Sequence, residues 1–357
     1  MAILKNTTID DTGFLQLPSG TAAQRPANPQ AGMIRFNTDE GYVEWYDDVT
    51  DVWFPTSEPP AVIATGGTVT DITQDGIQYR VHTFTSDGTF EVTRGGEVEY
   101  LVVAGGGAGG NWFSAGGGAG GVLNGSQSIQ SQNYPVVVGA GGAAVTNPSQ
   151  PPSAGTAMAP GGSGGNSSVF GLTALGGGGG GSGDGGNGAS GGSGGGGAGT
   201  DVPSGATGVF GSGTSGQGNR GGVAQPEFWD RPGGGGGGGA GQPGFDNNNI
   251  VNEAAKGGDG VFIQWADVAG LGDSGFFGGG GGGSTGRGVD EGTFESRNAG
   301  LAGLGGGGRG GNRSRVSTQP GTSGQVNTGG GGGGADTRFQ SATTGGSGIV
   351  IVRYRIG

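Results

Sequence analysis

The chain has 357 residues, 99 of them glycine and none cysteine, and its formal net charge is -12. An acidic chain is not attracted to nucleic-acid phosphate or to an anionic membrane surface, and no stretch approaches the roughly 18 apolar residues of a membrane span. We therefore expect neither a nucleic-acid partner nor membrane insertion. The absence of cysteine fits a protein that works outside the cell without disulfides.

The first sixty residues predict a small β module. Three short runs, Met33 to Asn37, Tyr42 to Tyr46 and Asp51 to Phe54, are rich in aromatic and β-branched residues and are separated by polar turn sequences, as in a three-stranded meander. A unit below roughly 70 residues seldom buries a sufficient core alone, and this one has no cysteine to staple it. Homo-oligomerisation is the expected remedy.

The segment Leu17 to Asp39, followed by Trp45-Tyr46-Asp47 and Trp53, resembles a module that recurs in bacteriophage tail-fibre and tail-spike chains. The resemblance implies a homotrimer whose amino-terminal region attaches to other virion tail proteins. The prolines that follow favour a short, semi-rigid linker. We expect a β module over residues 1–56, a linker over 57–68 and a glycine-rich domain over 69–357.

The glycine-rich part is bracketed by strand sequences on both sides. A turn signal, Ser86-Asp87-Gly88, separates two of them, and the last one closes the chain. The runs are Tyr79 to Phe84, Thr89 to Thr93, Val98 to Ala104, Tyr134 to Val138 and Gly348 to Tyr354. First and last strands of this kind commonly pair, so the sequence predicts a β-sandwich from which glycine-rich excursions leave and to which they return.

Six uninterrupted glycine tracts lie between these strands: residues 176–181, 194–197, 233–239, 278–283, 305–308 and 329–334. Composition alone favours a flexible linker. The strand brackets and the similar tract lengths favour the ordered alternative, in which each tract is a polyglycine-II rod with about three residues per turn and no internal hydrogen bonds. We expect a mostly β fold with bundled rods and no substantial α-helix.

Five blocks of this region, in their order, resemble the glycine-rich domain near the ends of many phage tail fibres, notably of marine phages. The blocks are Glu99 to Gly110, Tyr134 to Gly142, Gly275 to Gly283, Val326 to Gly334 and Gly345 to Tyr354. The resemblance covers about residues 65–357. It implies bundled polyglycine-II helices and a virion protein exposed outside the host cell.

The residues expected to bind a receptor lie in segments that join the rods, because loops on a rigid scaffold can vary while the scaffold cannot. Aromatic and amide side chains there suit stacking on sugars or anchoring in a partner surface. They are Trp112, Phe113, Phe228, Trp229, Asp230, Arg231, Phe245, Asn247 and Asn248. The structural alternative is that these aromatics cap the rods or fill trimer contacts.

Catalytic and cofactor patterns are weak. The single histidine, His82, lies in a predicted strand without a nucleophile beside it in the sequence, and no phosphate-binding loop precedes a lysine. Gly180 to Asn187 approaches a calcium-binding glycine-rich repeat but misplaces its aspartate. The Arg-Gly-Gly sequences at 220–222 and 309–311 resemble RNA-binding segments in an otherwise acidic chain. We expect no enzyme, no cofactor and no metal.

The sequence thus favours a phage tail fibre or receptor-binding protein that recognises a host-surface glycan or outer-membrane protein without cleaving it. A purely structural fibre component is the alternative. A bacterial adhesin exported by its own cell is a third hypothesis, but the amino terminus lacks the apolar core of an export signal.

Overall fold

The computed structural model describes residues 15–49, 51–56, 61–145, 157–183, 185–200, 207–224, 233–247, 254–285, 299–312, 319–335 and 343–356. The chain divides into two compact units, Met1–Ala61 and Val62–Gly357.

The first unit contains the expected meander. Its sheet has the order β1-β2-β3-β4, in which β2, β3 and β4 pair antiparallel and β1 adds a parallel strand that the sequence did not indicate. The elements are β1 (Ser19–Gly20), the 3-10 turn η1 (Ala22–Gln24), β2 (Ile34–Asn37), β3 (Tyr42–Asp47) and β4 (Val52–Pro55). The segment 19–25 therefore packs back onto the sheet and covers part of one of its faces.

A charged network stands where this small sheet would be expected to have an apolar core. The side chain of Glu44 is fully buried; it lies 2.7 Å from Nη2 of Arg25 and 3.4 Å from Nε of Arg35, and it accepts a hydrogen bond from Asn37. Burial by itself would raise the pKa of Glu44, but the hydrogen bonds from Arg25 and Asn37 and the nearby arginine charges outweigh burial and hold the pKa below its usual value. Glu44 is therefore ionised in the folded protein at neutral pH.

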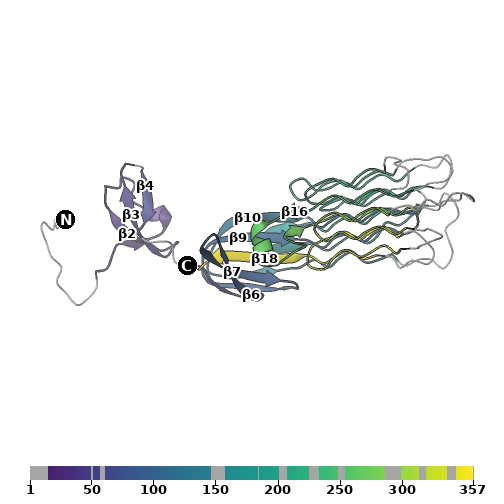
Figure 1. Ribbon diagram of the computed structural model, residues 1–357. Coiled ribbons are helices and arrows are strands. Elements are labelled where there is room, and N and C mark those ends of the chain that lie inside the picture. The colour runs from purple at the N-terminus through teal and green to yellow at the C-terminus, as the bar shows by residue number, and fades with distance from the viewer. Residues whose placement is uncertain are drawn as a thin grey trace, which may run out of the picture. The chain divides into compact units, whose positions relative to one another are not determined.

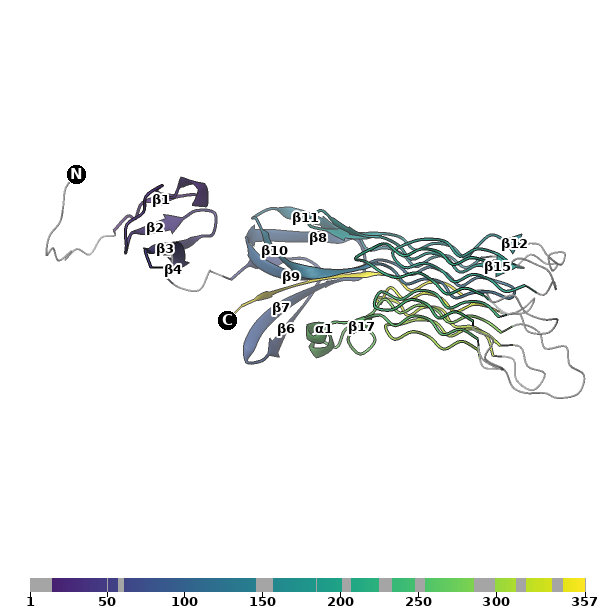
Figure 2. The ribbon, with the colours of Figure 1, turned by 90° about the horizontal axis from the view of Figure 1, so that it is seen from above.

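The second unit begins with a β-sandwich. One sheet has the order β10-β9-β18-β7-β6 and the other the order β11-β8-β5. The strands are β5 (Ile63–Thr65), β6 (Thr68–Gln74), β7 (Ile77–Phe84), β8 (Gly88–Arg94), β9 (Gly96–Val103), β10 (Val122–Ile129), β11 (Asn133–Val136) and β18 (Ile349–Arg355). Buried side chains such as Phe84, Phe90, Val102 and Val350 form the core cluster shared by strands of the two sheets. Figure 2 shows strands of both sheets, with β8 and β11 in the smaller one and β7, β9 and β10 in the larger one.

The last strand, β18, lies at the centre of the larger sheet, where it pairs antiparallel with both β7 and β9. The predicted pairing of the first and last strand sequences is therefore confirmed. Ile351 lies opposite Thr83 on one side and Leu101 on the other. The expected linker over 57–68 is too long: β5 pairs with β8, and β6 already begins at Thr68. Val62 is buried in the sandwich core, so apolar burial draws this segment into the second unit.

Shorter elements lie among the glycine segments. The helix α1 (Gln264–Val268) places Trp265 and Ala266 against the outer face of the larger sheet, in a second core cluster with Leu101 and Ile351. The remaining strands are β12 (Ala157–Met158), β13 (Ser167–Val169), β14 (Leu172–Ala174), β15 (Ser182–Gly183), β16 (Val261–Phe262) and β17 (Phe276–Phe277). With one five-residue helix among the described residues, this is a mostly β fold.

The glycine segments leave the sandwich as rods that run side by side in stacked layers (Figure 1). In the rod 114–121, successive amides donate to three different neighbours, and the direction repeats every third residue. Amides 115, 118 and 121 bond carbonyls 181, 178 and 175; amides 116 and 119 bond 235 and 238; amides 117 and 120 bond 332 and 329. A repeat of three with no bond inside the rod is the geometry of polyglycine II.

The rod 278–285 shows the same rule. Its amides 279, 282 and 285 bond carbonyls 305, 308 and 311; amides 280 and 283 bond 258 and 255; amides 281 and 284 bond 117 and 114. Three tracts start in the left-handed region that glycine favours, with φ of 73° at Gly278, 98° at Gly305 and 70° at Gly329. The tracts are ordered parts of the fold, so the flexible-linker interpretation is wrong for them.

Interior rod positions require glycine because another backbone lies against each side of the rod. A Cβ on Gly117, Gly237 or Gly281 would come closer than 3.0 Å to the carbonyl oxygen of a neighbouring rod. Side chains instead recur at intervals of three on surface rods, where they share a face. Lys256 and Asp259 form an ion pair of 2.8 Å in this way, and Leu301 and Leu304 are both exposed.

Candidate functional site

The rod ends that point away from the sheets bring together distant parts of the chain (Figures 1 and 2). Isolated bridges join Asn111 to Ala335 and Gly233 to Thr285, and the amide of Gly199 donates to the carbonyl of Phe113. The described residues at this end flank the segments 201–206, 225–232, 248–253, 286–298, 313–318 and 336–342. We call this part of the second unit the distal rod end.

Trp112 and Phe113 form a tight turn at the distal rod end. Both adopt left-handed backbone conformations, with φ of 67° and 47°, and their ring centroids lie 5.4 Å apart. The amide of Trp112 donates to the carbonyl of Ala335. Phe113 is only 6% exposed and packs in the turn, whereas Trp112 is half-buried, so Trp112 has the more accessible ring of the two residues predicted here.

Phe245 and Asn247 occupy a surface rod. Phe245 is 49% exposed, its ring lies 5.8 Å from the ammonium nitrogen of Lys256, and its amide donates to the carbonyl of the same lysine. The amide of Asn247 donates to the carbonyl of Val223. Both residues are thus fixed by backbone bonds while Phe245 presents its ring to solvent. Phe228, Trp229, Asp230, Arg231 and Asn248 lie outside the described residues.

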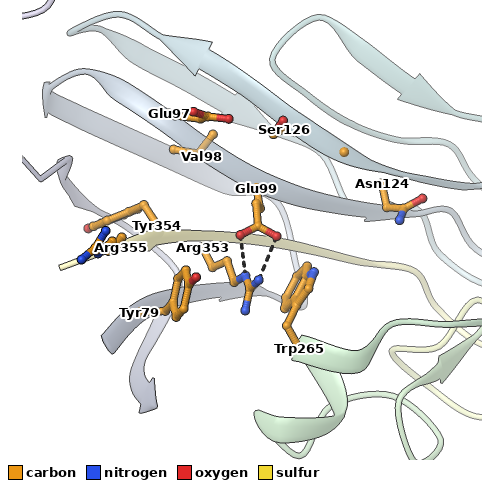
Figure 3. A pocket seen from close by; sticks show the side chains of 11 residues that line it. Tyr79, Glu97, Val98, Glu99, Asn124, Ser126, Trp265, Arg353, Tyr354 and Arg355 are labelled. Carbon is orange, nitrogen blue, oxygen red and sulfur yellow. Dashed lines mark hydrogen bonds and ion pairs between the residues drawn. The ribbon is translucent and has the colours of Figure 1, made fainter. Parts of the chain in front are cut away.

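A pocket of about 510 Å³ lies on the outer face of the larger sheet, beside α1. Figure 3 shows side chains from β7, β9, β10, β18 and α1 around it. Its polar lining includes the carboxylates of Glu97 and Glu99, the amide of Asn124 and the hydroxyl of Ser126. This set can hydrogen-bond a polar ligand.

Arg353 organises one wall of the pocket. Its guanidinium carbon lies 4.2 Å from the ring centroid of Tyr79 and 4.9 Å from that of Trp265. Its Nε and Nη2 donate to the two carboxylate oxygens of Glu99 at 3.1 and 2.8 Å, and Nη1 donates to Gln74 (Figure 3). The strand register accounts for the pair, because β18 sets Arg353 directly opposite Glu99.

The described residues include neither a metal-ligand cluster nor a helix that could span a membrane. Across the described residues, no group of three or more histidine, cysteine, aspartate or glutamate side chains could hold a metal ion. The described helices likewise include none long and apolar enough to cross a membrane.

Comparison with known proteins identifies the second unit. A family model described as a glycine-rich domain matches residues 83–355. The chain belongs to the glycine-rich domain family. No curated protein matches it.

The match to the glycine-rich domain runs from β7 through β18 and so includes every rod described above. Sequence reasoning missed the pocket and its arginine stack. A signal was present, because Arg353 interrupts the otherwise apolar run of β18. Its partners lie far away in the chain, however, and only the sheet register brings them together.

His82 of the glycine-rich domain is a structural residue. It is fully buried, its Nδ1 lies 2.7 Å from the carbonyl oxygen of Gly66, and its Nε2 lies 3.0 Å from the hydroxyl of Tyr354. Because a carbonyl only accepts, Nδ1 carries the proton, and the Tyr354 hydroxyl donates to Nε2. Burial lowers the pKa of His82 below its usual value of 6.5.

This environment predicts that acid weakens the glycine-rich domain. Below about pH 6.5 the histidine of the unfolded chain takes up a proton, whereas His82 of the folded chain stays neutral to a lower pH. The contribution of His82 to the free energy of unfolding is therefore complete above about pH 6.5. It is lost as the pH falls from about 6.5 toward the lowered folded pKa. Denaturant titrations of the second unit's transition at pH 7.5 and 5.5 measure this loss. His82→Gln, which cannot titrate, should remove most of it; an unchanged loss in that variant would assign the effect to other groups.

Proposed function

We propose that this protein is a phage tail fibre or receptor-binding protein that attaches the virion to the host-cell surface by non-covalent recognition. The observation that carries the proposal is the distal rod end. Rods held on three sides by backbone hydrogen bonds are rigid, and the ends of many of them meet there beside segments whose sequence is rich in large side chains. Binding residues are typically mounted in this way, on loops positioned by a stiff scaffold.

The expected partner is a host-surface glycan or an outer-membrane protein. Phe228, Trp229, Asp230 and Arg231 lie within one segment attached at the distal rod end, and aromatic and arginine side chains dominate binding energy in interfaces. Three copies of the chain would form a homotrimer, and its amino-terminal units would attach the fibre to other virion tail proteins. Both statements extend the resemblance of the two units to tail-fibre modules.

The alternative is a purely structural fibre component whose rods stiffen the assembly while another chain binds the host. The burial of Phe113 favours it in part, since one expected contact residue serves the turn instead.

Replacing residues 226–231 with a glycine-serine segment of equal length separates these functions. The adhesin should lose at least about tenfold in affinity for bacterial cells that the unaltered protein binds, because loss of one good anchor costs about 2 kcal/mol. The matched control is Leu301→Ser with Leu304→Ser, which changes exposed side chains along a rod. If the segment variant binds cells as strongly as the control variant and the unaltered protein do, the structural component is favoured. The same follows if the unaltered protein binds none of the bacterial cells tested.

A further inference from the structure

The sheet of the first unit has one face that is strongly apolar and exposed. Alternate residues of β2, β3 and β4 point to this side, and their relative exposures are 47% for Ile34, 37% for Phe36, 37% for Trp45, 44% for Val52 and 38% for Phe54. Val43 completes the set and is half-buried. We call these six residues the apolar face.

The six side chains form a continuous surface. Ile34 pairs with Trp45, and Trp45 pairs in turn with Phe54, so these three residues make a row across three strands. Phe36 and Val43 pair directly in the next row. The rings of Trp45 and Phe54 are in contact, with centroids 5.7 Å apart. Asp47 lies at one corner of this side, where it accepts a hydrogen bond from the amide of Val49.

The opposite face of the sheet carries the charged network together with the aromatic pair Tyr46 and Trp53, and it is the one that the chain itself covers. Arg35, Asn37 and Glu44 are buried there, and the guanidinium of Arg35 also donates to the carbonyl of Thr21. Within the described residues of this unit, Tyr46 is the one buried apolar side chain. The usual arrangement is therefore largely reversed, because the charged side chains are buried and most of the large hydrophobic ones are exposed. An apolar surface of this extent normally marks an interaction site.

We propose that the apolar face packs against the same face of other copies of this chain and so holds the assembly together. The face is self-complementary, because its six members carry no charge, Asp47 lies only at its corner, and the acidic residues at positions 39, 40, 48 and 51 are exposed outside it. The described part of the second unit offers no comparable surface, since its exposed large hydrophobics lie singly, as Val137 does, or in pairs, as Leu301 and Leu304 do. A second copy is the partner with a matching flat apolar sheet.

This assignment rests on the self-association within the proposed function, and not on adhesion. It also accounts for the first unit's stability: a module with one buried apolar side chain gains its hydrophobic burial from its neighbours.

The test measures the mass of the full-length protein by sedimentation equilibrium between about 1 and 100 µM, a range that resolves micromolar association. We expect the unaltered chain to form a defined oligomer. Phe36→Ser, Trp45→Ser and Phe54→Ser together should weaken self-association at least 100-fold. The control pair Leu301→Ser and Leu304→Ser, at comparably exposed sites of the second unit, should leave the mass unchanged.

A second variant guards against unfolding of the triple variant. Ile34→Lys alters a single half-exposed side chain without removing a buried one, and it sets like charges against each other in the assembled face. It should also yield monomers with an unchanged circular dichroism spectrum. A monomeric unaltered chain would overturn the proposal. The apolar face would then be assigned to contacts with another part of the same chain, such as residues 1–14. An oligomer that survives Ile34→Lys would overturn it as well. Host-cell binding is not a readout here, so failure of the adhesion proposal would be seen separately.

Discussion

Gly281→Ala is expected to lower the free energy of unfolding of the glycine-rich domain by at least about 3 kcal/mol, the upper part of the range for overpacked interiors. Gly281 lies in the middle of a rod and donates to the carbonyl of Gly117. The added methyl group would collide with the carbonyl oxygen of Gly332. Since backbone, rather than a flexible side chain, stands in the way, the collision can be relieved only by moving a rod and breaking its hydrogen bonds.

Chemical denaturation followed by circular dichroism measures this loss. The control is Gly88→Ala, where the nearest atoms to the added Cβ are 3.3 and 3.4 Å away and belong to the ring of Phe84. That change should cost less than about 1 kcal/mol, as accommodated substitutions do. Equal midpoints for the two variants would mean that the rods are not packed closely enough to exclude a Cβ.

Glu44→Ala is expected to unfold the first unit and leave the glycine-rich domain intact. The substitution leaves Arg35, whose side chain is 6% exposed, without its carboxylate partner, and breaking a buried pair in this way costs about 3 to 5 kcal/mol. A unit with so little buried apolar surface has no reserve to absorb that loss. Two-dimensional NMR should show collapsed signals for residues of the first unit and unchanged signals for the second.

Glu44→Gln, which keeps the shape and one acceptor, should be milder and should also remove a dependence on acid. Because the folded pKa of Glu44 lies below its unfolded value of 4.5, its contribution is fully present above that pH and is lost as the pH falls through the folded pKa. An acid transition of the first unit that persists unchanged in Glu44→Gln would place its cause elsewhere.

The strands could be predicted because they carry local signals. β-branched and aromatic runs next to turn residues predicted most of the meander and sandwich strands, and the strand at 348–354 could be paired because it closes the chain. The parallel strand β1 has only two residues and gives no such signal. Alternation in Ile34-Arg35-Phe36-Asn37 marks a strand, but it does not show that the charged side is the covered one.

The sequence predicted that the glycine tracts form polyglycine-II rods, but not which rods are hydrogen-bonded to each other. Glycine has no side chain to encode which neighbour it bonds, so the partners of residues 114–121 follow only from the assembled bundle. Part of the arrangement does leave a trace: non-glycine residues three apart, such as Lys256 with Asp259 and Leu301 with Leu304, mark the outer faces of surface rods. The pocket left only one local trace, the arginine within the apolar run of β18, because its arginine stack unites residues 79, 265 and 353.

The most direct test of this account is amide hydrogen exchange in the rod 114–121, measured by NMR on glycine-labelled protein. Every amide from 115 to 121 donates to a neighbouring segment, so we expect the labelled glycines at 116, 117, 118, 120 and 121 to be protected as strongly as the buried strand β9. Exchange of these glycines at the rate of an unstructured peptide, while β9 remains protected, would contradict the rod bundle and restore the flexible linker.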